Sequence, residues 1–122
     1  MIIIYIISGA TLLLLLKSNK INYKKANRLI NKGAVILDVR TSDEFRQGHY
    51  NYNGRIAINY PLDELENDIK TNNLKLIEEG VYVIYCRSGR RSKIASDLLN
   101  KNGYKTFYIV GDYTNLLSLN KN

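Results

Sequence analysis

The only cysteine of this 122-residue chain stands where a reactive thiol would be placed. The segment Val81–Tyr85 is apolar and rich in residues that favour strands, and Cys86 follows it directly. The next residues, Arg87–Ser92, include a glycine and three arginines and lead into a helical pattern. A loop between a strand and a helix directs backbone N–H groups at one point, where they stabilise an anion. We therefore expect Cys86 to ionise readily and to act as a nucleophile.

This interpretation of Cys86 competes with a simpler one. A lone cysteine is more often a small buried residue, and a group of arginines is more often a solvated surface. Packing alone does not explain a cysteine that ends a buried strand and is followed by Gly89 and by arginines at positions 87, 90 and 91. The glycine allows the backbone to close around the sulfur, and the arginines lower the pKa of the thiol. We therefore favour the nucleophile.

Metal and disulfide chemistry are not expected. One cysteine cannot form an internal disulfide or a thiolate cluster, and the chain has one histidine, His49, besides it. Zinc is therefore improbable, and we expect neither a metal site nor a cofactor. We interpret His49 as a loop or core histidine, because no pattern in the sequence brings it near Cys86.

The positive charge of the chain is concentrated near its N-terminus. The formal net charge is +7, but six of the 18 basic residues lie between Lys17 and Lys32, and the first acidic residue is Asp38. The rest of the chain is nearly neutral. A nucleic-acid-binding domain would spread basic residues and stacking aromatics over a folded face. We therefore do not expect a nucleic-acid partner.

The uncharged segment Ile2–Leu16 predicts a membrane anchor. As a helix it would span about 24 Å against a bilayer core of about 30 Å, so Lys17 would have to extend towards the lipid headgroups. A cleaved signal peptide is less favoured, because the segment has no basic start and no small-residue cleavage site. We expect an anchor at residues 1–17 and a single folded domain at 18–122, with the lysines and the domain on the cytoplasmic side.

Strand and helix patterns alternate along the domain, which is typical of a parallel sheet covered by helices on both faces. Ser42 is predicted to cap a helix that has acidic residues in its first turn, and Pro61 is predicted to open another helix. The other predicted helices are Tyr23–Asn31, Arg91–Asn102 and Tyr113–Leu119. The predicted strands are Ala34–Val39, Arg55–Tyr60, Val81–Tyr85 and Thr106–Val110.

Four blocks of this pattern resemble one family, the rhodanese domains, over roughly Asn22 to Tyr113. The matching blocks are C-R-S-G-R-R-S (86–92), L-D-V-R-T-S-D-E-F (37–45), Gly48-His49 and N-Y-P-L-D-E-L (59–65). The resemblance implies a three-layer α/β sandwich with a five-stranded parallel sheet. It also implies a sulfurtransferase whose catalytic cysteine alternates between thiolate and persulfide, carrying sulfur from thiosulfate or a persulfide donor to a small-molecule thiol or protein acceptor.

The resemblance also implies residue roles. Cys86 would carry the sulfur, and Arg91 would in addition brace the loop. Asp38, Arg40 and Glu44 match supporting positions, and we interpret them first as structural polar pairs. The residues implied to bind substrate are Arg87, Ser88, Gly89, Arg90 and Arg91.

Two departures from the family affect the rim of the site. The chain has Gly111-Asp112-Tyr113 where the family has Gly-Gly and a tail ending in Trp, and it has gained residues around Asn51–Gly54. Two other functions stay open at this point: a cysteine phosphatase and a membrane-held module that senses persulfides or docks a partner. Phosphatase loops resemble C-x5-R, whereas here Ser92 occupies the sixth position after the cysteine. The oligomeric state is not predicted.

Overall fold

A four-stranded parallel sheet forms the centre of the domain. The computed structural model describes residues 18–119. All neighbouring strands are parallel, in the order β4-β1-β5-β6. The strands are β1 (Val35–Asp38), β4 (Ile58–Asn59), β5 (Val81–Tyr85) and β6 (Lys105–Tyr108). β5 is apolar throughout because it lies between two strands and beneath helices on both sides.

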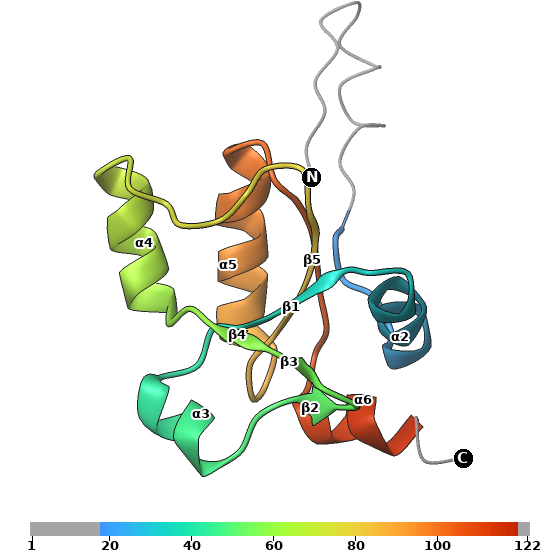
Figure 1. Cartoon of the computed structure of the whole chain (residues 1–122). Coiled ribbons are helices and arrows are strands. Elements are labelled where there is room, and N and C mark those ends of the chain that lie inside the picture. The colour runs from blue at the N-terminus through green and yellow to red at the C-terminus, as the bar shows by residue number, and fades with distance from the viewer. Residues whose placement is uncertain (1–17, 120–122) are drawn as a thin grey trace, which may run out of the picture.

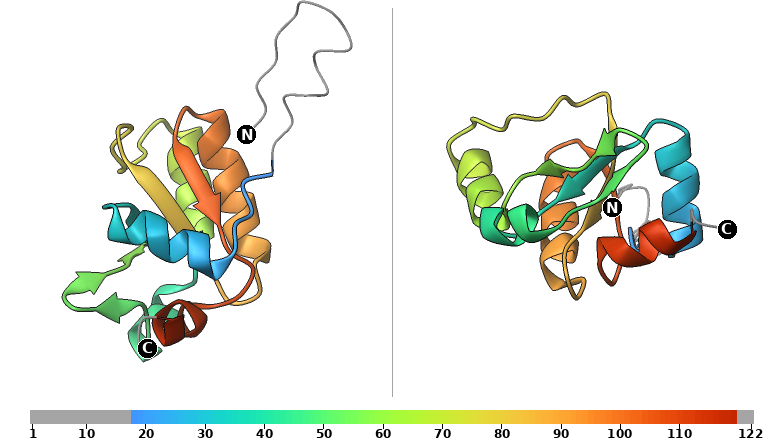
Figure 2. Two further views of the ribbon diagram at one scale, coloured as in Figure 1. Left: turned by 90° about the vertical axis from the view of Figure 1, so that its right-hand side faces the viewer. Right: turned by 60° about the horizontal axis from the view of Figure 1, so that its bottom comes forward.

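Helices cover both faces of this sheet (Figure 1). α4 (Leu62–Lys70) and α5 (Arg90–Lys101) lie on one face, whereas α2 (Tyr23–Asn31) and α6 (Tyr113–Leu119) lie on the other. Side chains of a strand point alternately to opposite faces, so Tyr82 and Ile84 of β5 join the core beneath α5 and α4. Val83 and Tyr85 join the core beneath α2 and α6. Figure 2 shows the same layers from two further directions. The expected α/β arrangement is confirmed.

A fifth strand, which the resemblance implies, is absent from the sheet of residues 18–119. Residues 19–21 lie beside the outer edge of β6 instead, where Lys20 forms an isolated parallel bridge with Tyr108. Tyr108 N–H donates to the Asn19 carbonyl, and Ile21 N–H donates to the Tyr108 carbonyl. The segment cannot extend into a strand, because Asn22 already caps α2 by accepting a hydrogen bond from Lys25 N–H at 2.8 Å.

The strand predicted at Arg55–Tyr60 is divided in two. Its first half, β3 (Arg55–Ile56), forms an antiparallel hairpin with β2 (Asn51–Tyr52), and only its second half, β4, joins the main sheet. Asn53 and Gly54 both have positive φ angles (51° and 83°), as the two-residue turn of such a hairpin requires. The residues gained relative to the family therefore build a small hairpin, and the break falls at Ala57, whose N–H donates to the Tyr50 carbonyl.

The cap predicted at Ser42 is also wrong by one residue. α3 (Ser42–Gln47) is capped by Thr41, whose hydroxyl accepts a hydrogen bond from Glu44 N–H. The Glu44 carboxylate accepts in return from Thr41 N–H at 3.0 Å, which completes a reciprocal capping box. Thr41 rather than Ser42 is the cap, because only the residue three positions before Glu44 can form these two reciprocal hydrogen bonds with it. The box also fixes the direction of Glu44.

The anchor predicted at residues 1–17 lies outside the described residues. Between residues 18 and 119, the helices are all too short or too polar to cross a membrane.

Candidate active site

Cys86 lies immediately after β5, at the carboxyl edge of the sheet. The alternation along the strand continues through it, so its side chain points to the same face as Tyr82 and Ile84, towards α5. The residue is completely buried. Its sulfur thus lies beneath the loop of residues 87–89 and in front of the first turn of α5.

Three polar groups surround the sulfur. Gly89 N–H and Ser92 N–H both donate to Sγ, at 3.1 and 3.3 Å, and the Ser92 hydroxyl oxygen is 3.4 Å from it. Backbone N–H groups at the start of a helix have no partner within the helix and carry partial positive charge. The loop and α5 therefore form an anion site that is already filled by the side chain of Cys86.

Gly89 makes this arrangement possible in two ways. It is the N-cap of α5 and has a left-handed conformation, with φ of +100°, that residues with side chains rarely adopt. A Cβ atom here would also lie 2.9 Å from the Val110 Cα. Because glycine has no side chain to cap the helix, the Cys86 sulfur takes that role and accepts from the N–H of Ser92, the third helical residue.

These contacts decide the ionisation of Cys86. Burial acts to raise the pKa of the thiol, because it disfavours the charged form. The hydrogen bonds from the Ser92 hydroxyl, Ser92 N–H and Gly89 N–H oppose burial and hold the pKa below its ordinary value. The geometry therefore favours the thiolate, which is the nucleophilic form.

The arginines of the loop do not act as one group. Arg87, Ser88 and Arg90 are exposed to solvent and give the entrance a positive charge. Arg91 instead turns towards α3 and binds Glu44 through two parallel hydrogen bonds, of 2.6 and 3.1 Å. Its planar fork is fully engaged there, so Arg91 links the loop to α3.

The Glu44–Arg91 pair makes a pH-dependent contribution to stability. The hydrogen bond from Arg91 is the main cause that lowers the pKa of Glu44 from 4.5 to about 2, with Thr41 adding to it. A carboxyl group whose pKa is lower in the folded state stabilises the fold above its unfolded pKa and loses this effect as the pH falls through its folded pKa.

We expect Glu44→Gln to lower the free energy of unfolding by about 1–2 kcal/mol at neutral pH, since the pair is only partly exposed. The difference from wild type should disappear as the pH falls from 4.5 towards 2. Urea denaturation at several pH values measures this, with Glu66→Gln on the exposed face of α4 as the control. A difference independent of pH would show that the carboxylate charge is not involved.

A second ion pair lies behind the loop. Asp38 is completely buried at the end of β1, and its carboxylate accepts hydrogen bonds from the Arg40 guanidinium (2.7–3.1 Å) and from the Tyr85 hydroxyl (2.6 Å). Arg40 also donates to the Gly48 carbonyl and lies over the rings of both Tyr85 and Tyr113. The group joins β1, β5, α3 and α6 and does not contact the sulfur through any of these bonds.

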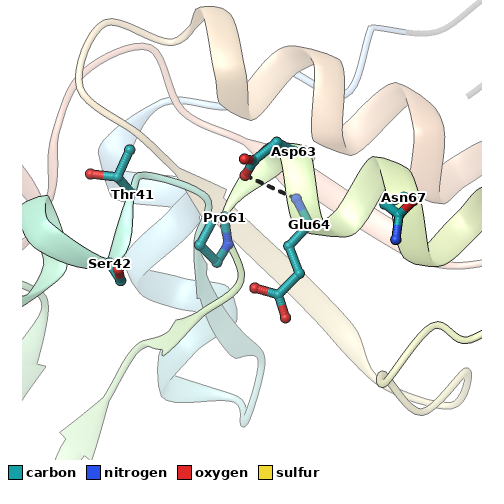
Figure 3. A pocket seen from close by; sticks show the side chains of 6 residues that line it. All are labelled: Thr41, Ser42, Pro61, Asp63, Glu64 and Asn67. Carbon is teal, nitrogen blue, oxygen red and sulfur yellow. Dashed lines mark hydrogen bonds between the residues drawn. The ribbon is translucent and has the colours of Figure 1, made fainter.

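Among residues 18–119, two hollows open at the carboxyl edge of the sheet. One, of about 240 Å³, includes Arg87 of the loop. The other, of about 470 Å³, lies between the first turns of α3 and α4 (Figure 3). The first is lined by Arg40, Glu44, Gln47, Gly48, Arg87, Asp112 and Tyr113; the second is lined by Thr41, Ser42, Pro61, Asp63, Glu64 and Asn67. Cys86 lines neither hollow, because the loop covers it.

The structure adds a residue that was not among the predicted site residues. Ser92 approaches the sulfur through both its N–H and its hydroxyl, yet the sequence indicated it only as the end of the loop. The available signal was that a helix capped by glycine leaves the N–H of its third residue without a side-chain partner.

His49 stacks on Phe45 with ring centroids 3.8 Å apart, and its Nδ1 lies 2.8 Å from the Phe45 carbonyl.

The model of the rhodanese-like domain matches residues 22–118 of this chain. The chain belongs to the rhodanese-like family. The match includes the sheet, the covering helices and the loop around Cys86, so the family expected from the sequence blocks is confirmed. At the level of the family, this supports sulfur transfer.

Several relatives share most of the domain. A Schizosaccharomyces pombe protein, provisionally named as a mitochondrial thiosulfate sulfurtransferase, is 39% identical over 93 residues, which are 69% of this chain and 61% of that protein. Thiosulfate sulfurtransferase 18 of Arabidopsis thaliana is 32% identical over 75% of this chain and 71% of its own length. The crystal structure of a rhodanese-related protein from Thermoplasma volcanium is 26% identical, covers 85% of this chain and 93% of its own, and has a TM-score of 0.64.

Proposed function

We propose that this rhodanese-like domain carries sulfane sulfur as a persulfide on Cys86. The Cys86 thiolate attacks the outer sulfur of thiosulfate, forms a new S–S bond and releases sulfite, which leaves with the electron pair of the broken bond. A thiolate or cyanide acceptor then attacks the terminal sulfur of the persulfide and returns Cys86 to the thiolate. Both steps conserve charge and need no cofactor.

The observation that carries this proposal is the position of Sγ in front of two backbone N–H groups at the start of α5. These groups stabilise the thiolate before the reaction and an anionic sulfur chain after it. The exposed Arg87 and Arg90 add positive charge at the entrance, which attracts an anionic donor. Because the thiol is completely buried, its surroundings must open before the donor reaches it.

The same geometry disfavours a cysteine phosphatase. Phosphoryl transfer requires donors around three equatorial oxygens and a clamp such as a free guanidinium. Arg91 is bound to Glu44 through both its terminal nitrogens, and the sixth position after Cys86 is Ser92. The N–H groups of the loop already converge on one sulfur atom.

Mass spectrometry of the full-length chain tests the proposal. After incubation with thiosulfate or a low-molecular-weight persulfide, the peptide that contains Cys86 should gain the mass of one sulfur atom, and cyanide should remove it. Cys86→Ser should gain none. Aryl phosphates should not be hydrolysed at a measurable rate. The proposal fails if wild type gains no sulfur from either donor, or if hydrolysis of aryl phosphates depends on Cys86 and exceeds sulfur transfer.

We further propose that residues 1–17 hold the domain at a membrane with Cys86 on the cytoplasmic side. The support is the uncharged segment Ile2–Leu16 and the lysines that follow it. The full-length protein should stay with the membrane fraction after washing with carbonate or concentrated salt. Release by salt would indicate a peripheral contact, and labelling of Cys86 only from outside the cell would contradict the orientation.

A further inference from the structure

The Ser92 hydroxyl has more acceptors around it than it can serve. The residue is completely buried. Its oxygen lies 3.1 Å from the Gly89 carbonyl, 3.2 Å from the Ile109 carbonyl and 3.4 Å from the Cys86 sulfur. A serine hydroxyl has one proton to donate and two lone pairs to accept with. The hydroxyl can therefore donate to a carbonyl or to the sulfur, but not to all three groups at once.

The charge on the sulfur decides between these two arrangements. A neutral thiol has its own proton and can donate it to the Ser92 oxygen, while the hydroxyl donates to a carbonyl. When the thiol ionises, its proton leaves to water and no proton lies between sulfur and oxygen. The hydroxyl then makes a charge-assisted hydrogen bond if it turns its proton to the thiolate, and such bonds are stronger than neutral ones.

We propose that Ser92 is a positioning residue whose hydroxyl turns from the carbonyls of Gly89 and Ile109 to the sulfur whenever Cys86 becomes anionic. This inference deepens the proposed function and rests on it, since the anion is either the thiolate or the sulfur chain of the persulfide. The hydroxyl thus supplies an interaction that the neutral thiol does not have.

The surroundings permit this rotation without other movement. Ser92 N–H already donates to Sγ and fixes the backbone, so only the torsion of the hydroxyl changes. The Gly89 carbonyl keeps a second donor, Lys93 N–H at 3.1 Å, when the hydroxyl leaves it. The buried position excludes competing water, which strengthens the preference of the hydroxyl for the charged sulfur.

Ser92→Ala in the full-length chain tests the inference, with Ser96→Ala as the matched control. Ser96 lies one turn later on α5, is also completely buried, and its hydroxyl contacts Thr106 Oγ1 at 2.7 Å rather than the sulfur. Because Cys86 is the only cysteine, the far-ultraviolet absorbance of its thiolate, corrected with Cys86→Ala, reports one group.

We expect Ser92→Ala to move the thiolate midpoint to higher pH and to lower sulfur transfer near neutral pH about tenfold, as the loss of one hydrogen bond to a charged group does. The rate should recover as the pH rises. Ser96→Ala should leave the midpoint unchanged. Equal midpoints in wild type and Ser92→Ala, or equal shifts in both variants, would overturn the inference.

A measurement on the wild-type chain covers the case in which Ser92→Ala does not fold. The carbonyl carbon shift of Gly89 or of Ile109 should titrate with the same midpoint as the thiolate absorbance, because the carbonyl that accepts from the hydroxyl beside the neutral thiol loses this donor at that point. Shifts of both carbonyls that stay constant through the titration would overturn the inference. Neither titration needs a sulfur donor, so their failure is distinguishable from a failure to form the persulfide.

Discussion

Gly89→Ala is expected to lower sulfur transfer by about 100-fold or more, the effect of losing a preorganised donor to an anionic centre. The new Cβ would meet the Val110 Cα at 2.9 Å, a backbone atom that cannot turn away. The loop would have to move, and with it the Gly89 N–H that donates to the Cys86 sulfur. Rates of sulfur transfer from thiosulfate to cyanide measure the effect.

Gly103→Ala is the matched control for that variant. Gly103 follows α5, and its φ angle of +89° is close to that of Gly89, but no atom lies within 4 Å of its Cβ position. Alanine there has the strain of the left-handed conformation, about 1–2 kcal/mol, without a collision or a change at the sulfur. If both variants lose the same small amount of activity, the close approach of Gly89 to Val110 is not needed for sulfur transfer.

Asp38→Ala is expected to lower the free energy of unfolding by about 3–5 kcal/mol, the range for removing one partner of a buried ion pair. Asp38 is completely buried, and its carboxylate accepts from Arg40 and from the Tyr85 hydroxyl. Without it, the Arg40 guanidinium would stay buried without the carboxylate that neutralises its charge, although it would keep its hydrogen bond to the Gly48 carbonyl. Urea denaturation measures the change.

The control for Asp38→Ala is another aspartate in an ion pair. Asp97 pairs with Lys93 at 2.8 Å on the exposed surface of α5, one turn apart. Exposed pairs of this kind are screened by solvent and contribute little, so Asp97→Ala should change stability little. The structural interpretation of Asp38 would be wrong if the two variants were equally stable.

The bounds of α2 are those that the sequence predicted, because apolar spacing and the glycine that follows the helix mark them. The predicted start of α6 at Tyr113 is also confirmed. β5 and Cys86 were equally visible, since a buried central strand has an uninterrupted apolar sequence. The site residues that contact one another through charge, such as Glu44 and Arg91, were each named from the family blocks. Their pairing was not, because 47 positions separate them along the chain.

The errors arose where tertiary contacts override a local pattern. Residues 55–60 look like one strand in the sequence, with three apolar residues in a row at 56–58, but the positive φ angles of Asn53 and Gly54 turn the first half into a hairpin. Residues 19–21 lie where a fifth strand would pair with β6, but they form only one bridge, because α2 begins directly after its cap at Asn22. Ser92 was missed because the glycine cap indicates only that the N–H of the third helical residue needs a partner, and not that this partner is the Cys86 sulfur.

In many enzymes a reactive group lowers the stability of the folded state. The Cys86 sulfur, which caps α5, does not have this disadvantage. Here the sulfur of the proposed nucleophile occupies the position of an N-cap side chain, so the negative charge that the proposed sulfur transfer requires would also stabilise the first turn of α5. Since folding lowers the pKa of Cys86, the thiolate adds to stability above the ordinary thiol pKa, and this contribution is lost as the pH falls through the folded value. Selection for reactivity and selection for stability therefore act on this residue in the same direction.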